Sequence, residues 1–155
     1  MAPSNHYPDI GTLGEDFVAE WLAENGSKIL HRRWKSGRRG EIDIIALVEA
    51  KGKINISTQE KTLAFVEVKT RSARNWDSGG RDAVESRKQT KIISAAQMFL
   101  AEYPDKENYT CRFDVAIVSC KPKPNTAISS QENSGYYLTL QEYIAGAFNS
   151  NGDNW

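Results

Sequence analysis

An acid and a base occur inside one of the most apolar stretches of this chain. Residues 64–69 read Ala-Phe-Val-Glu-Val-Lys, and their aromatic and β-branched side chains predict a buried strand. Glu67 and Lys69 share one face of such a strand, because side chains two positions apart point the same way. Burying an uncompensated ion costs several kcal/mol, so the fold must supply a paired charge or a bound cation there.

A second apolar run carries two more carboxylates. Residues 40–46 read Gly-Glu-Ile-Asp-Ile-Ile-Ala, which places Glu41 and Asp43 on one face of a predicted strand. If the two runs pair as a hairpin, these acids and Glu67 meet Lys69. We therefore expect surplus negative charge that a divalent cation balances. The alternative is a solvent-exposed strand face, where a Glu-x-Lys pair occurs by chance in many proteins.

The rest of the pattern predicts an α/β fold with one domain. At 155 residues the chain can form one hydrophobic core and has no room for a second domain. The expected elements are a helix ending at Asn25-Gly26, strands at 28–31, 41–48 and 63–70, a helix at 84–103, a strand at 111–118, a short strand at 136–138 and a short helix at 141–148. We predict one domain over 1–155, with a core at about 10–118, a flexible segment at 119–135 and a C-terminal strand and helix at 136–148.

Two charged residues on the predicted helices border the expected acidic cluster. Glu15 lies at the edge of the buried stripe of the first helix, where it either forms a capping box with Thr12 or serves as an active-site acid. The two roles do not exclude each other. Lys88 lies one turn before Ile92, on the inner face of the second helix, and its neighbour Lys91 is offset from that face.

Composition excludes several kinds of site. The chain has no net charge, two cysteines without a CxxC pair and two separated histidines, which argues against a zinc site, a disulfide framework and a hydrolytic triad. No segment is long and apolar enough to act as a signal peptide or to span a membrane, so we predict a cytoplasmic protein with no membrane partner.

Basic residues nevertheless gather locally. The run 31–39 is either a solvated loop or a phosphate-binding surface. The candidate nucleic-acid contacts are Arg32, Arg33, Lys35, Arg38, Arg39 and, after the second apolar strand, Arg71. Trp76 follows in a Gly- and Ser-containing segment and could stack on an exposed base.

Together these motifs resemble a known family. Asp43 followed by Glu67-Val68-Lys69 is similar to the signature of the PD-(D/E)xK, or restriction-endonuclease-like, nuclease superfamily. The five blocks 11–15, 40–46, 65–69, 88–91 and 112–115 more closely resemble the small bacterial YraN-like proteins, which are similar to archaeal Holliday-junction resolvases. Ile42 stands where the superfamily has its proline, as it does in those relatives. The segments 48–63 and 121–135 look longer than the pattern requires.

The resemblance implies a restriction-endonuclease-like core, in which a mixed central sheet is flanked by helices. It implies Mg²⁺ or Mn²⁺ held by Asp43, Glu67 and the main chain of Val68, with Lys69 in catalysis and Glu15 as a further catalytic acid. Glu41, Lys88 and Lys91 are accessory residues. The leading prediction is a metal-dependent endodeoxyribonuclease that hydrolyses DNA phosphodiesters, with branched DNA as one expected substrate, and that works as a homodimer. The alternatives are a non-catalytic nucleic-acid-binding module on a nuclease scaffold and a protein-interaction domain whose acids only form salt bridges.

Overall fold

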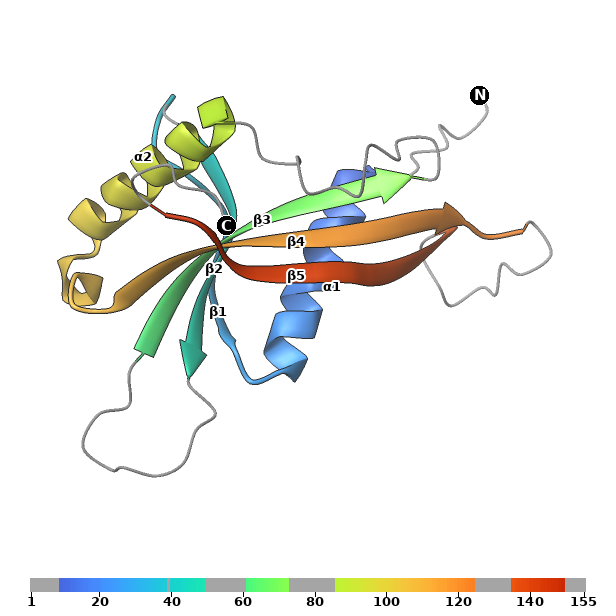
Figure 1. Cartoon of the computed structure of the whole chain (residues 1–155), viewed down its shortest axis with the longest axis horizontal. Helices are drawn as coiled ribbons and strands as arrows, with labels where there is room; N and C mark the ends of the chain where they lie inside the picture. The colour runs from blue at the N-terminus through green and yellow to red at the C-terminus, as the bar shows by residue number, and fades with distance from the viewer. Residues whose placement is uncertain (1–8, 39, 50–60, 73–85, 125–134, 150–155) are drawn as a thin grey trace, which may run out of the picture.

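A five-stranded sheet forms the centre of the computed structural model, which describes residues 9–38, 40–49, 61–72, 86–124 and 135–149 (Figure 1). In chain order the elements are α1 Ile10–Glu24, β1 Lys28–Lys35, β2 Glu41–Glu49, β3 Lys61–Ser72, α2 Ser86–Glu102, a short 3-10 helix Pro104–Lys106, β4 Thr110–Pro122 and β5 Tyr136–Phe148. The strand order is β1-β2-β3-β4-β5. Only β3 and β4 run parallel; the other neighbours are antiparallel. This mixed α/β sheet with flanking helices confirms the predicted restriction-endonuclease-like core.

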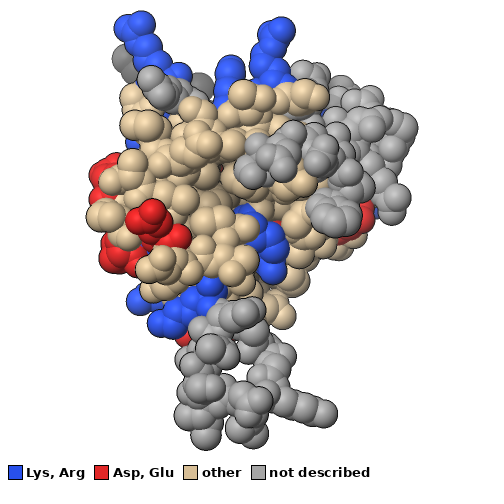
Figure 2. Space-filling view, turned by 60° about the vertical axis from the view of Figure 1, so that its left-hand side comes forward, with Lys and Arg blue, Asp and Glu red and all other residues tan. Residues whose placement is uncertain are grey.

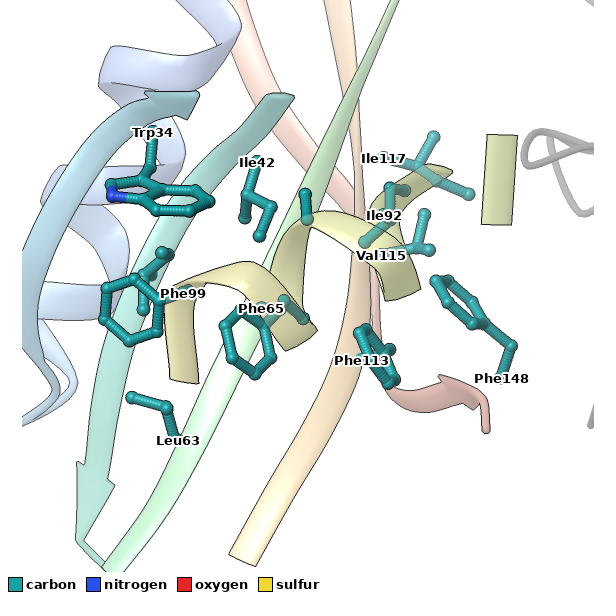
Figure 3. Close-up of a cluster of buried hydrophobic side chains, with 13 residues drawn as sticks. Trp34, Ile42, Leu63, Phe65, Ile92, Phe99, Phe113, Val115, Ile117 and Phe148 are labelled. Atoms are coloured by element: carbon teal, nitrogen blue, oxygen red, sulfur yellow. The ribbon is translucent and has the colours of Figure 1, made fainter. Parts of the chain in front are cut away.

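The two helices cover opposite faces of the sheet, and each seals its own apolar cluster (Figure 1). On one face Phe99 of α2 packs edge-on against Trp34 and Phe65, with ring centroids 5.4 and 5.9 Å apart (Figure 3). On the other face Val18 and Leu22 of α1 pack against the sheet. Because both faces are covered, the middle of β3 is apolar on both sides, and its buried Glu67 needs polar partners.

The C-terminal segment differs from the prediction. A helix at 141–148 was wrong, since these residues continue β5, which pairs antiparallel with β4 from Pro122 to Phe113. Leu138 and Leu140 alternate with exposed neighbours along the first half of the strand, and both pack on the α1 side. The last eight residues of β5 have a local helical pattern, but their pairing with β4 outweighs it. Rules that use only neighbouring residues cannot predict such pairing.

Two strands extend further than their sequences indicated. β1 continues to Lys35, so the first half of the basic run is strand and not loop. β4 continues to Pro122, so residues 119–122 belong to the sheet and not to a flexible segment. The remainder of that segment at 125–134, the long connection at 50–60, Arg39 and Trp76 lie outside the described residues.

The first residue of α1 determines the position of Glu15 within the helix. The proposed capping box was wrong: the helix begins at Ile10, and Oδ1 of Asp9 accepts a hydrogen bond from the Gly11 N–H at 3.1 Å. Glu15 therefore belongs to the second turn and has no capping role. Gly14 is buried against Thr70 of β3, where a Cβ would collide with the Thr70 hydroxyl. This close approach places the following residue, Glu15, near the end of β3.

Candidate functional site

Two carboxylates face each other across the β2–β3 pair. The register pairs Ile44 with Val66, which sets Asp43 opposite Glu67 on the neighbouring strand. The Val68 N–H donates to Oδ2 of Asp43 at 2.8 Å, and the charge of Glu67 acts directly on the Asp43 carboxyl group. Glu67 is only 3% exposed. The predicted meeting of these acids is therefore what the sheet register produces.

The proximity of the two acids changes their protonation. Burial and the charge of Glu67 raise the pKa of Asp43 from 3.8 to about 7, against the opposing hydrogen bond from Val68. Two carboxylates this close cannot both ionise cheaply in a site screened from water. Without a cation the pair therefore retains a proton near neutral pH, and a divalent cation could take the place of that proton.

Two lysines complete the inner part of the site. Lys88 at the start of α2 forms an ion pair with Oε1 of Glu67. Lys69 lies two residues beyond Glu67 in β3 and is half-buried. Burial and then the positive charge of Lys88 lower the pKa of Lys69, although Glu67 opposes this. Lys69 therefore gives up its proton more easily than an exposed lysine does.

Glu15 and Glu41 form an outer group beside the inner pair. Oε2 of Glu15 accepts a hydrogen bond from Nε of Arg33 at 2.6 Å, and Glu41 lies 3.6 Å from Lys35. Burial raises the pKa of Glu15, with the Arg33 hydrogen bond opposing and the charge of Asp43 adding to it. Arg33 is the one non-glycine residue of the described chain with a positive φ, 50°. The same residue reaches α1 through its guanidinium, which holds Glu15.

The charge balance differs from the surplus of negative charge expected from the sequence. Within the described residues, Glu15, Glu41 and Glu67 each have their own basic partner, and Lys69 adds a further positive charge. Only Asp43 lacks one. The sequence argument failed because Arg33, Lys35 and Lys88 come from β1 and α2, and the spacing within the two central strands says nothing about them. Charge alone does not require a cation here.

The donor set still suits a hard divalent cation. No group of three or more His, Cys, Asp or Glu side chains in the described part of the chain is arranged to hold a metal ion. Asp43 and Glu67 would therefore supply two carboxylates, which is the number that Mg²⁺ typically takes from a protein while keeping waters or phosphate oxygens as its other ligands. Each residue offers the oxygen donors that such an ion prefers, and the raised pKa of Asp43 shows that a positive charge beside its carboxylate would be favoured.

Among the described residues, several of the predicted nucleic-acid contacts already have acidic partners. Nη2 of Arg32 is 2.6 Å from Asp16 of α1, and Arg33 and Lys35 hold Glu15 and Glu41. Arg38 is exposed, and the half-buried Arg71 adds its charge near Lys69. Figure 2 shows Lys and Arg side chains projecting at the top of the molecule, the end at which α2 begins in Figure 1. Surface ion pairs are weak enough to exchange for phosphate contacts.

The remaining accessory residue, Lys91, has a different position from Lys88. Its side chain is exposed, and its main-chain oxygen lies 3.0 Å from where a Cβ on Gly40 would be. Within the described chain it forms no ion pair with the acidic cluster. Lys91 therefore marks the contact between α2 and the residue that precedes β2, and the structure does not bring it to the carboxylates.

A third buried acid was missed at the sequence level. Asp114 of β4 is fully buried and receives Nε and Nη2 of Arg112 at 2.8 and 2.9 Å. The Tyr143 hydroxyl and the Gly146 N–H of β5 also donate to it, at 2.6 and 2.9 Å. A signal was present in the sequence: Arg112 and Asp114 are a base and an acid two positions apart in an apolar strand, as Glu67 and Lys69 are. Here the charges balance, and the cluster joins β4 to β5.

The sequence model of the uncharacterised protein family UPF0102 matches residues 14–118. The chain belongs to this family. The YraN-like resemblance is thereby confirmed, and the matched region runs from Gly14 to the middle of β4, so it includes all four carboxylates of the site together with Lys69 and Lys88. The match ends before β5.

Curated UPF0102 relatives extend the similarity over most of the chain. UPF0102 protein alr1796 of Nostoc sp. is 52% identical over 143 residues, covering 90% of this chain and 94% of its own length. Relatives from Trichormus variabilis and Synechocystis sp. are 49% and 40% identical, each over 90% of this chain and over 94% and 97% of their own. The UPF0102 names give no activity, so chemistry has to be argued from the site.

No helix in the described part of this UPF0102 chain is long and apolar enough to cross a membrane.

The Asp43→Asn variant should show how much the protonation of Asp43 contributes to the stability of the folded protein. The folded protein binds this proton more tightly than the unfolded chain, so its contribution to stability is complete below about pH 4 and is lost as the pH rises through about 7. Asparagine cannot ionise and keeps the shape. We expect the variant to be more stable than wild type at pH 8 in EDTA, on the order of 4 kcal/mol, with the difference shrinking as the pH falls and vanishing only below about pH 4.

Urea unfolding of both proteins at several pH values measures this difference. A constant difference between wild type and Asp43→Asn from pH 5 to 8 would show that Asp43 does not retain its proton in the folded state.

Proposed function

We propose that this protein is a metal-dependent endonuclease that hydrolyses DNA phosphodiester bonds with Mg²⁺ or Mn²⁺. The observation that carries the proposal is the pairing of Asp43 and Glu67 across β2 and β3, with Lys69 directly beside them. A structural ion pair needs one acid and one base. Two acids set opposite each other, one with its pKa raised by burial and by the other's charge, are costly for stability, and such arrangements are typical of functional sites.

In the proposed reaction, each residue of the site has its own role in phosphodiester hydrolysis. Asp43 and Glu67 would hold the cation, with the main chain of Val68 as a further ligand, and the bound cation would neutralise the phosphate and the charge that grows on it. Lys69 has a lowered pKa, so its Nζ is suited to hold the attacking water and to accept its proton, or to stabilise negative charge when protonated. Glu15 adds a further acid near Asp43, where it could orient water.

DNA is the proposed substrate because phosphate groups match the surroundings of the site. Arg33, Lys35 and Arg38 lie along the strand and turn that lead into β2, and Arg71 follows Lys69. These side chains could contact phosphates on either side of the bond to be cut. A preference for branched DNA and a homodimer that holds two equivalent strands follow from the resemblance and remain parts of the proposal, as does the cytoplasmic location predicted from the sequence.

Purified protein incubated with four-way junction, flap, single-stranded and duplex DNA tests this function. We expect cleavage of at least one of these substrates with Mg²⁺ or Mn²⁺, none in EDTA and none by the Asp43→Ala variant. Absence of metal-dependent cleavage on every substrate would contradict the proposal. Equal cleavage by Asp43→Ala would do the same, because it would trace the activity to a contaminant.

A non-catalytic DNA-binding module is the second candidate, and the ion pairs favour it. Glu15, Glu41 and Glu67 are each matched by a basic residue without any cation. This candidate predicts DNA binding that weakens with salt: the logarithm of the binding constant should fall against the logarithm of the salt concentration with a slope of about −0.9 for each phosphate neutralised. The binding should persist in Asp43→Ala, and wild type should not cleave DNA. Electrophoretic mobility shifts at several salt concentrations, measured beside the cleavage assay, distinguish the two.

A further inference from the structure

Lys88 occupies an unusual position for an accessory residue. Its ammonium group forms an ion pair with Glu67, whose side chain is 4% exposed, while the Lys88 side chain itself is 45% exposed. The charges of Asp43 and Lys69 also act on Lys88, so all three groups lie close together. The flexible stem thus reaches from solvent into the site and leaves one positive charge beside both inner carboxylates.

A cation bound between Asp43 and Glu67 would bind the same carboxylate whose charge Lys88 already neutralises. The ion pair engages Oε1 of Glu67, and Val68 already engages Oδ2 of Asp43. A divalent ion would also lie close to the ammonium group of Lys88, where two positive charges repel each other in a partly buried site. Lys88 and the metal ion therefore cannot both make their best contacts with Glu67.

We infer that Lys88 is a tethered substitute for the metal ion, which neutralises Glu67 in the metal-free protein and must leave it when the ion binds. This inference rests on the proposed metal site and describes how that site is regulated. The exposure of Lys88 gives its ammonium group a way out, because its stem can turn toward solvent without disturbing buried residues of α2. Released from Glu67, it is placed at the edge of the site where a substrate phosphate would accept it.

A consequence is that metal affinity is low until substrate arrives. The metal ion must displace an ion pair before it binds, so part of its binding energy is spent on that exchange. A phosphate that draws Lys88 away favours the same change, and the two ligands then strengthen each other's binding. Residue 88 would in this way couple metal loading to the presence of the polyanion.

Isothermal titration of the full chain with Mn²⁺ tests the inference without relying on cleavage. We expect Lys88→Gln to bind Mn²⁺ about tenfold more tightly than wild type, since it loses the competing charge. Arg87→Gln is the matched control: it removes one positive charge from the neighbouring exposed position of α2 and should stay within about twofold of wild type. Lys88→Arg retains the charge and should show no gain.

Thermal unfolding gives a second readout. In EDTA, Lys88→Gln should melt at a lower temperature than wild type, because Glu67 is left without its cation, and Mn²⁺ should raise its melting temperature more than it raises that of wild type. Lys88→Arg, which keeps the ion pair, should melt close to wild type.

The outcomes separate this inference from the proposed function. Mn²⁺ binding by Lys88→Gln that is equal to or weaker than that of wild type overturns the role of Lys88, and so does a gain in Lys88→Arg. No Mn²⁺ uptake by any of the proteins overturns both the inference and the metal site. A tenfold gain in Lys88→Gln together with no DNA cleavage by wild type supports the inference and leaves the proposed nuclease activity wrong.

Discussion

The Lys69→Met variant is expected to cleave DNA about a thousandfold more slowly than wild type while binding Mn²⁺ at least as tightly. Lys69 has no carboxylate of its own, and its pKa is lowered by burial and by Lys88. It is therefore available to the attacking water or to the transition state. Methionine keeps the apolar stem and removes only the amine, and it also removes a positive charge that repels the metal ion.

The measurement combines two assays on each variant. Single-turnover cleavage at saturating Mg²⁺ gives the rate of the chemical step, and titration with Mn²⁺ gives the affinity for the metal. Lys28→Met, at the start of β1 and outside the site, serves as a control for the loss of one exposed lysine. A Lys69→Met protein that cleaves within tenfold of wild type would exclude Lys69 from the chemistry.

Glu67→Gln provides the contrast within the same experiment. This substitution keeps the size of the side chain but removes a charge from one of two expected metal ligands, so cleavage and Mn²⁺ affinity should fall together. If Lys69→Met also lost its Mn²⁺ affinity, the lysine would be acting on the arrangement of Asp43 and Glu67 instead of on the reaction. The two variants thus distinguish a residue that binds the metal ion from a residue that acts in the chemical step.

The inner pair of the site was predictable from sequence because its geometry is local. Asp43 and Glu67 lie in two apolar strands that follow one another, and a hairpin register is enough to bring them together. Their partners were less predictable. Lys88 was expected to reach the acidic cluster, and its ion pair with Glu67 confirms this. The contacts from Arg33 to Glu15 and from Lys35 to Glu41 were missed because they depend on the strand β1, whose length was underestimated.

The secondary structure, like the site, was predictable where it depends on local sequence and not where it depends on distant residues. The amphipathic helices and the buried strands have strong periodic patterns, and the predicted order of the first six elements agrees with the structure. Residues 141–148 become strand because β4 offers them a partner and because Asp114 accepts a hydrogen bond from Gly146. Such a contact joins residues 32 positions apart, which periodicity cannot detect.

Asp114→Ala is expected to lower the free energy of unfolding by about 3 to 5 kcal/mol. The carboxylate is fully buried and accepts hydrogen bonds from Arg112, Tyr143 and the Gly146 N–H. Removing it leaves the guanidinium and the hydroxyl without their acceptor in a site that water does not reach easily. Since Tyr143 and Gly146 belong to β5, the loss should fall mainly on the attachment of that strand to β4.

Urea unfolding measures the size of this effect, and Tyr143→Phe calibrates it. The phenylalanine variant loses a single hydrogen bond to the buried charge and should cost about 1.5 to 3 kcal/mol, with the ion pair to Arg112 intact. Hydrogen exchange of β5 amides should accelerate more in Asp114→Ala than exchange in β2 and β3, because the central strands keep their own pairing. A loss below about 1 kcal/mol in Asp114→Ala, or uniform acceleration across the sheet, would show that Asp114 does not hold β5 in place.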